Sequence, residues 1–388
     1  MGKTGSLLKR NIRQYVMVIV FIVVIILFQI LTGGVLLKPL NISNLISQNA
    51  YILILAVGML LCILTGGNVD LSVGSVAGFV GAISAIMMLK WGVPEVPTII
   101  ISLILGLAIG CWQGFWIAYV GVPAFIATLA GMLIFRGLTL VVLQGTSLAP
   151  LPDSYTFLAS GFIPDIANVA GLNILALVCG IVASILYVLK ELNGRKNKKK
   201  YGFEVTSNKI FIPQVIGILA VINAFAFALA SYKGIPMVLV IIVALVLLYS
   251  FVTMKTIPGR HIYAFGGNAK AAQLSGVNTK KVMFWVYANM GVLAALAGIV
   301  FTGRLNSATP KSGVNFELDA IAACFIGGAS TSGGVGTIVG AMVGGLLMGV
   351  LNNGMSIMGV SIDWQQTIKG FVLLGAVAFD VYSKSKSK

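Results

Sequence analysis

Long apolar runs alternate with short polar connections from one end of this 388-residue chain to the other. A run of about 20 apolar residues is long enough to cross the hydrocarbon core of a bilayer as a helix. The pattern predicts an all-α polytopic membrane protein, a single transmembrane domain over residues 1–388, with about twelve spans. The predicted spans are Tyr15–Leu37, Ala50–Leu64, Val73–Leu89, Thr98–Val120, Ala124–Leu143, Leu172–Leu189, Ile210–Ala230, Pro236–Met254, Val282–Gly303, Ala320–Ile326, Thr337–Leu351 and Trp364–Tyr382.

The tenth span, Ala320–Ile326, is too short to cross about 30 Å of hydrocarbon as a helix. Two interpretations remain open for it. The helix begins earlier, near Phe316, or it is a broken helix whose irregular backbone lines a cavity.

The charges of the connections predict the orientation of the spans. Nineteen of the 26 Lys and Arg residues fall in segments that this topology places in the cytoplasm, and five fall outside. The largest cytoplasmic segments are a basic loop at 190–209 and a polar loop at 255–281. Since cytoplasmic loops carry an excess of Lys and Arg, both chain termini are predicted to be cytoplasmic.

A glycine pattern occurs twice. Gly66-Gly67 precedes a Gly-xxx-Gly series that starts at Gly74, and Gly327-Gly328 precedes a similar series that starts at Gly336. Both copies follow an inward span and begin an outward one. The pattern predicts two parallel pseudo-repeats, a common plan among transporters. The alternative is that Gly-xxx-Gly is a general helix-packing pattern.

The composition excludes several classes of protein. Charged residues make up 9% of the chain and hydrophobic residues 58%, which is typical of an integral membrane protein. The net charge of +16 lies in the loops, so it indicates membrane orientation and not a nucleic acid partner. With one histidine, and four cysteines far apart in apolar runs, the sequence predicts no metal site and no disulfide.

The polar segment Gly259–Lys281 is the most distinctive connection. It turns at Gly266-Gly267, and Asn268 is a good N-cap for a short helix over 269–274 that Gly276 would end. A helix of two turns is too short to be stable alone. The segment is a solvated loop or a docking helix for a soluble partner, and its residues alone leave both interpretations open.

Five polar or aromatic residues are candidates for a translocation pathway. Asp70 either gates such a pathway or caps the third span. The aromatic and amide groups of Trp112 and Gln113 suit a sugar ring, but tryptophan is also common in helix packing at membrane interfaces. The candidate pathway residues are Asp70, Ser72, Trp112, Gln113 and Asn352.

The sequence contains no catalytic motif. Gly327–Gly336 lacks the Gly-Lys-Ser/Thr ending of a phosphate-binding loop, so the chain is not expected to hydrolyse ATP. The single histidine has no nucleophile motif beside it. The acids fall almost wholly at span ends, whereas ion-coupled carriers usually hold carboxylates inside the membrane. Energy for uphill transport would therefore come from another subunit.

Four motifs carry a resemblance to a known family. They are Leu64–Ser75, Pro123–Met132, Gly259–Gly276 and Leu318–Gly328, and with them almost the whole chain resembles the permease subunits of bacterial monosaccharide ABC importers, of the ribose, galactose and xylose type. The chain looks closest to the longer xylose or multiple-monosaccharide branch. Compared with the ten-span ribose type, the sixth and seventh spans with the basic loop would be an inserted hairpin.

The resemblance implies an assembly in the bacterial cytoplasmic membrane. Two permease chains, expected to be identical, would form the pathway, and a separate ABC ATPase that binds ATP and Mg²⁺ would dock inside. An extracytoplasmic sugar-binding protein would dock outside. The 259–281 segment would then be the coupling segment. The residues implied to contact the ATPase are Gly266, Gly267, Asn268, Ala271, Ala272, Leu274 and Gly276.

Three alternatives remain open at this stage. Similar permeases carry nucleosides, branched-chain amino acids or furanosyl signals, so the solute could differ. The chain could be an ion-coupled secondary carrier or a channel, in which case it would transport without an ATPase. A structural membrane scaffold is the third alternative, and the glycine-interrupted spans argue against it.

Overall fold

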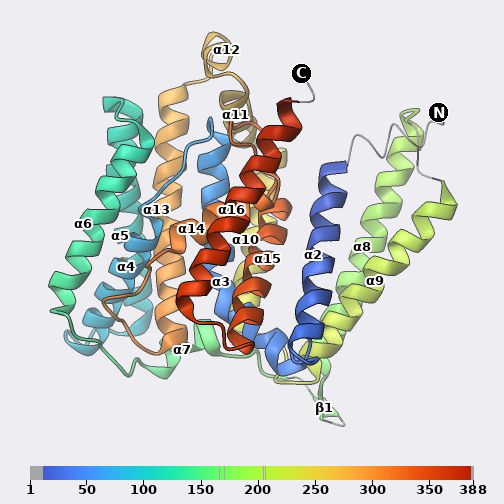
Figure 1. Ribbon diagram of the computed structural model, residues 1–388, viewed down its shortest axis with the longest axis horizontal. Coiled ribbons are helices and arrows are strands. Elements are labelled where there is room, and N and C mark those ends of the chain that lie inside the picture. The colour runs from blue at the N-terminus through green and yellow to red at the C-terminus, as the bar shows by residue number, and fades with distance from the viewer. Residues whose placement is uncertain (1–11, 166, 170, 204, 206, 386–388) are drawn as a thin grey trace. The chain divides into compact units, whose positions relative to one another are not determined.

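The computed structural model describes residues 12–165, 167–169, 171–203, 205 and 207–385. These residues are nearly all helical (Figure 1). Eight of the described helices are long and apolar enough to cross a membrane. The elements are α2 (Ile12–Leu31), α3 (Pro39–Leu64), α4 (Val73–Leu89), α5 (Glu95–Phe115), a π-helical turn (Trp116–Val120), α6 (Ala124–Leu143), α7 (Asp153–Ser160), β1 (Asn168–Val169), β2 (Leu172–Asn173), α8 (Ile174–Lys200), α9 (Asn208–Ala230), α10 (Met237–Lys255), α11 (Ile257–Gly267), α12 (Ala269–Leu274), α13 (Thr279–Leu305), α14 (Phe316–Ile326), α15 (Ile338–Ile357) and α16 (Ile362–Ser385).

The contacts divide the chain into two compact units. Unit 1 comprises the described residues of Met1–Leu36, Leu45–Ser160 and Val238–Lys388, and unit 2 comprises Leu37–Asn44 and Gly161–Met237. Unit 2 contains the helix pair α8 and α9. This is the hairpin that the sequence identifies as an insertion, and it packs as a separate unit.

Each predicted span coincides with a helix, but several boundaries differ. The polar stretch before Ala50 is helical, because Pro39 starts α3 and its asparagines and serines continue it. The tenth span starts at Phe316, which confirms the earlier start. The basic segment 190–209 is not a loop throughout, since α8 continues to Lys200. Lysines at a helix C-terminus interact favourably with the helix dipole.

Unit 1 is built around α13, which packs along both α5 and α4. Half of α13 is buried, including the run Ala294–Ala295 and Gly291. A β-carbon at Gly291 would overlap the backbone of α5 at Gly106 and Gly110. Small residues let helix backbones approach closely, as is typical of membrane proteins.

Helix α4 begins deep within unit 1. It runs parallel to α13, because Ala77 packs on Gly298 and Gly81 lies beside Thr302. Continuing this register puts Val73, the first residue of α4, level with the middle of α13. The segment between α3 and α4 therefore enters the depth of the membrane before α4 starts.

Helix α14 also begins at this level and runs the opposite way. A β-carbon at Gly74 would lie 3.2 Å from the Cβ of Phe316. Tyr51 of α3 stacks on Phe316 at 3.9 Å, and Cys324 donates a 3.3 Å hydrogen bond to the carbonyl of Ala56, so α14 runs parallel to α3. Since α3 runs antiparallel to α13, the N-termini of α4 and α14 meet in the interior and their helices diverge.

The structure gives two relations between the halves of unit 1. The paired-glycine segments lie together, because a β-carbon at Gly67 would overlap the carbonyl of Thr331 and one at Gly333 the backbone of Gly66. This agrees locally with the parallel repeat, which remains a prediction for whole half-molecules. The second relation is one of direction: acidic residues lie at the starts of α4 and α14, which run in opposite directions.

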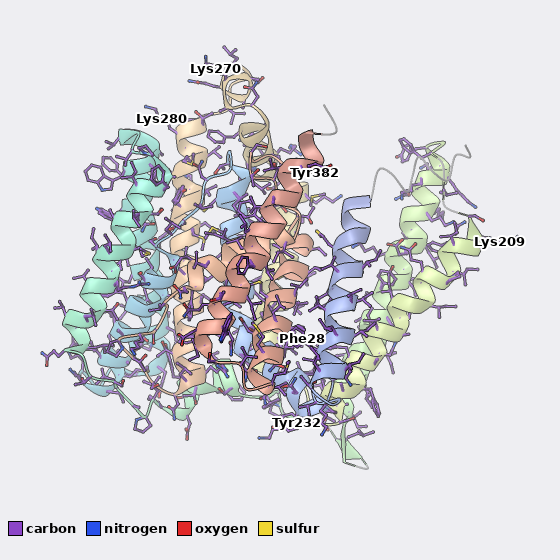
Figure 2. The ribbon with its side chains drawn as sticks, in the orientation of Figure 1. Phe28, Lys209, Tyr232, Lys270, Lys280 and Tyr382 are labelled. Carbon is purple, nitrogen blue, oxygen red and sulfur yellow. The ribbon has the colours of Figure 1, made fainter. Side chains whose placement is uncertain are left out.

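In unit 2, α8 packs against α9 where Gly180 meets Ala226. Within the apolar windows of the two helices only 11% of α8 and 6% of α9 is buried, which suits contact with lipid. Lys209 and Tyr232 mark the two ends of α9 (Figure 2). Within unit 1, Lys270, Lys280 and Tyr382 lie at one end (Figure 2).

We expect Gly74→Ala to destabilise the fold. Its methyl group would overlap the carbonyl of Gly313 and the carboxylate of Glu317, and the backbone carbonyl cannot rotate away. Overpacking of this kind costs about 1–3 kcal/mol. Thermal unfolding of the purified protein in detergent measures the effect as a lower Tm.

Gly137→Ala on α6 is the matched control, because no atom lies within 4 Å of its added methyl group. Its Tm should stay the same or rise, since alanine favours helix over glycine. Equal Tm values for both variants would contradict the close approach of α4 and α14.

Candidate functional site

The predicted coupling segment folds as two short helices, α11 and α12. Asn268 caps α12, its side chain accepting a 3.0 Å hydrogen bond from the amide of Ala271, and Gly276 has the left-handed φ of +88° expected of a residue that ends a helix. The sequence predicted a turn at Gly266-Gly267. Instead these glycines form the last residues of α11, and the chain turns at Asn268.

The short helix α12 presents an apolar side chain to solvent. Leu274 is 91% exposed, whereas Ala272 is 6% exposed and packs on the chain itself. Ala271 is exposed. A single exposed leucine is common on protein surfaces, so the docking role of this helix stays a prediction. In Figure 1, α12 projects beyond the ends of the neighbouring long helices of unit 1.

The base of this segment is fixed to both glycine segments. A β-carbon at Gly266 would overlap the carbonyl of Leu64, which also accepts a 3.0 Å hydrogen bond from the amide of Gly334. The phenol of Tyr263 donates a 2.7 Å hydrogen bond to the carbonyl of Gly336. Burial raises the pKa of Tyr263, so the phenol remains a neutral donor. A displacement of α11 is therefore transmitted to the connections that precede α4 and α15.

Three predicted pathway residues form one buried network. The carboxylate of Asp70 accepts a 2.9 Å hydrogen bond from the amide of Ser72 and a 2.6 Å hydrogen bond from its hydroxyl. The Gln113 amide donates to that hydroxyl at 2.7 Å. All three side chains are buried. Asp70 therefore holds Ser72, the residue that precedes α4, and it lies inside the unit and not at the cytoplasmic surface. Its role in a pathway stays a prediction.

The other two predicted pathway residues lie apart from this network. Trp112 is partly exposed and packs edge-on against Phe135 at 6.1 Å. Asn352 was expected in an outer connection but lies on α15, which continues to Ile357. Its Oδ1 atom is buried without a hydrogen-bond partner among the described residues. The structure thus joins Asp70, Ser72 and Gln113 but neither of these two.

Acids also lie at the start of α14, and the prediction that they sit at span ends near the surface is wrong for this pair. Glu317 and Asp319 are buried in its first turn, level with the middle of α13. Carboxylates in a first helical turn are stabilised by the helix dipole. The sequence pattern missed this because α14 starts in the interior.

Asp319 joins three helices. Its Oδ1 accepts from the ammonium group of Lys369 on α16 at 2.9 Å, and its Oδ2 accepts from the phenol of Tyr51 on α3 at 3.1 Å. The side chain of Asp319 is 5% exposed and that of Lys369 is 20% exposed. An ion pair at this depth is the arrangement that makes a lysine tolerable within a membrane span.

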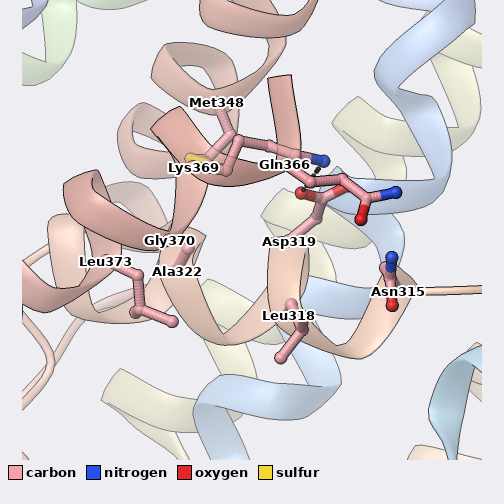
Figure 3. Close-up of a pocket in the computed structure, with 9 residues that line it drawn as sticks. All are labelled: Asn315, Leu318, Asp319, Ala322, Met348, Gln366, Lys369, Gly370 and Leu373. Carbon is pink, nitrogen blue, oxygen red and sulfur yellow. Dashed lines mark hydrogen bonds and ion pairs between the residues drawn. The ribbon is translucent and has the colours of Figure 1, made fainter. Parts of the chain in front are cut away.

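A cavity of about 220 Å³ adjoins the ion pair. Figure 3 shows Lys369 and Gln366 extending from α16 toward Asp319 on α14. The lining residues are Asn315, Leu318, Asp319, Ala322, Met348, Gln366, Lys369, Gly370 and Leu373. The sequence did not indicate this cavity. Its only signal was a lysine within an otherwise apolar span.

The chain is similar to known transport permease components over almost its whole length. The family model described as "Branched-chain amino acid transport system / permease component" matches residues 41–377. The xylose transport system permease protein of Haemophilus influenzae is 40% identical over 377 residues, which cover 97% of this chain and 98% of that protein. The corresponding protein of Escherichia coli K12 is 37% identical, covering 100% and 96%.

The ribose import permease protein of Bacillus subtilis is 38% identical over 344 residues, which cover 89% of this chain and 85% of that protein. No solved structure matches the chain. The similarity to the xylose proteins thus extends over more of this chain than the similarity to the ribose protein.

We expect Lys369→Met to lower the stability of the protein in detergent. The substitution leaves the Asp319 carboxylate buried with only Tyr51 as its partner. Breaking a buried pair by removing one partner costs about 3 kcal/mol or more. Adding Asp319→Asn removes the charge and keeps an acceptor for Tyr51, so the double variant should have a higher Tm than Lys369→Met alone.

Lys311→Met is the control, because Lys311 is exposed and its loss should change the Tm little. If Lys369→Met and Lys311→Met melt at the same temperature, the ion pair does not contribute to stability.

Proposed function

Because the chain belongs to this family of transport-system permease components, we propose that it is the transmembrane permease subunit of an ATP-driven ABC importer for monosaccharides. Relatives that match nearly the whole chain are named as xylose permeases, which supports xylose, or several monosaccharides including xylose, as the solute. The chain itself supplies the pathway and no catalytic step.

The exposed helix α12 is the observation that supports coupling to an ATPase. It presents Leu274 to solvent, and α11 behind it contacts the glycine segments before α4 and α15. A partner protein that binds α12 could therefore move helices α4 and α15. We assign the coupling role to residues 259–281, with Ala271 and Leu274 as contacts and Gly266 and Ala272 as the residues that hold the helix in place.

Partner proteins supply the other parts of the proposed importer. A second copy of this chain completes the pathway, and a separate ABC ATPase binds ATP and Mg²⁺ at the cytoplasmic side. A sugar-binding protein delivers the solute from outside, and it contributes much of the selectivity. The membrane is the bacterial cytoplasmic membrane, with both termini of the chain in the cytoplasm.

Gentle purification from native membranes, followed by reconstitution, tests the proposal. We expect the chain to co-purify with an ABC ATPase, and uptake of labelled xylose into proteoliposomes to require ATP and the binding protein. A chain that purifies alone and transports without ATP would instead be a secondary carrier. ATP-driven uptake of a nucleoside, and not of a sugar, would support the ABC importer but show that its solute is a nucleoside.

We expect Leu274→Asp to uncouple the complex. In the proposed complex the leucine contacts the ATPase surface, and a carboxylate in its place would lose its hydration there. Loss of a central apolar contact weakens docking about tenfold or more. Sugar uptake should fall while the isolated ATPase remains active. Ala271→Arg should act in the same way, whereas a bulky residue at Ala272 would also disturb packing within the chain.

Phe203→Ser is the control for this experiment, since Phe203 is a similarly exposed apolar side chain in another polar connection. Its uptake should match the wild type. If the Leu274→Asp variant couples ATP hydrolysis to uptake normally, α12 does not lie in the ATPase interface.

Cysteine labelling tests the orientation. In a background with Cys179 replaced by alanine, we expect Lys311→Cys to react with a membrane-impermeant maleimide in intact cells. Lys270→Cys should react only after the membrane is opened. The reverse pattern would place α12 outside, where no ATPase could reach it.

A further inference from the structure

The cavity beside Asp319 has the chemistry of a solute site. We propose that it is a subsite for a neutral polyhydroxylated molecule, which the monosaccharide occupies during its passage (Figure 3). The inference rests on the proposed function, since it assigns a place on the pathway to the transported sugar. It adds a site on α14 and α16 to the three buried residues near α4.

Three polar groups at the cavity have unused hydrogen-bonding capacity. No hydrogen bond joins the Gln366 amide or the Asn315 amide to another described residue, and Lys369 uses one of its three N–H groups on Asp319. An amide can donate twice and accept twice. Together these groups can bind a ligand that both donates and accepts several hydrogen bonds.

Asn315 supplies one of the two amides that line the cavity. It precedes α14 in the left-handed conformation, at φ +66°, and its side chain does not cap the helix. Asparagine before a helix usually caps it, and asparagine adopts the left-handed conformation more readily than most residues other than glycine. The amide is left available to the cavity that it lines.

The depth of the cavity argues against contact with lipid. Asp319 lies in the first turn of α14, whose start is level with the middle of α13. An amide without a partner in hydrocarbon costs several kcal/mol. Polar side chains at this depth therefore face a water-filled passage or a partner chain. Gln366 is exposed on the surface of unit 1, so this face borders one of the two, and the proposed subsite requires the water-filled passage.

The charge of the cavity selects among solutes. Lys369 and Asp319 neutralise each other at 2.9 Å, so the site presents no net charge. An amino acid or a nucleotide would have to break that ion pair to bind by its charged groups. Met348, Leu373 and Ala322 supply an apolar wall suited to the C–H face of a sugar. Amides, one ammonium group and an apolar wall together favour a neutral polyol.

The test uses the reconstituted complex of permease, ATPase and binding protein. Gln366→Met and Asn315→Gly remove one amide each, and glycine retains the left-handed backbone at 315. Loss of a hydrogen bond to a neutral ligand should lower xylose uptake per ATP hydrolysed about three- to tenfold. The xylose affinity of the separate binding protein does not depend on the permease variant and is measured as the check on that component. Thr367→Val, on α16 but outside the cavity lining, should behave as wild type.

A labelling experiment separates the subsite from the importer itself. In the Cys179→Ala background, Gln366→Cys should react with a water-soluble methanethiosulfonate, and millimolar xylose with binding protein should slow the reaction. Labelling without protection, together with normal uptake by Gln366→Met, would overturn the subsite alone. Absence of ATP-driven sugar uptake by the wild-type complex would overturn the proposed function instead. No labelling of Gln366→Cys would show that this face is not aqueous.

Discussion

Unit 1 depends on one constraint: helices α4 and α14 begin in its interior, where the residues of their first turns are largely buried. The amide of Ser72 before α4 is satisfied by the carboxylate of Asp70, and α14 carries Glu317 and Asp319 in its first turn, where the helix dipole stabilises negative charge. The two N-termini can meet only because Gly74 leaves room for the neighbouring backbone. The buried acids lie at these two helix starts. The lysine on α16 and the cavity both adjoin Asp319.

The order of the apolar helices was readable from hydrophobicity, because a membrane span requires a long apolar run, whereas the short helix α7 in a polar connection was not predicted. The boundaries were less readable where polar residues are helical. Pro39 starts α3 well before the apolar run at Ala50, and α8 continues through its lysines to Lys200. The two ends of α12 were predictable as well, since asparagine at 268 and glycine at 276 favour the local geometry of a helix start and a helix end.

The interior site was only partly predictable. Asp70 and Ser72 are neighbours in the chain, and Gln113 joins them through a helix contact that spacing alone did not reveal. The cavity beside Asp319 was missed because its polar groups come from α14 and α16, some fifty residues apart. A lysine in an apolar span indicates a buried partner, but the partner is known only when the depth of α14 is known.

The contact between α11 and the glycine segments is backbone against backbone. At Gly266 and Gly334 no side chain intervenes, so there are no rotamers that could absorb a small movement. A shift of α11 toward these segments would therefore have to displace their backbone, because no side chain can rotate out of the way.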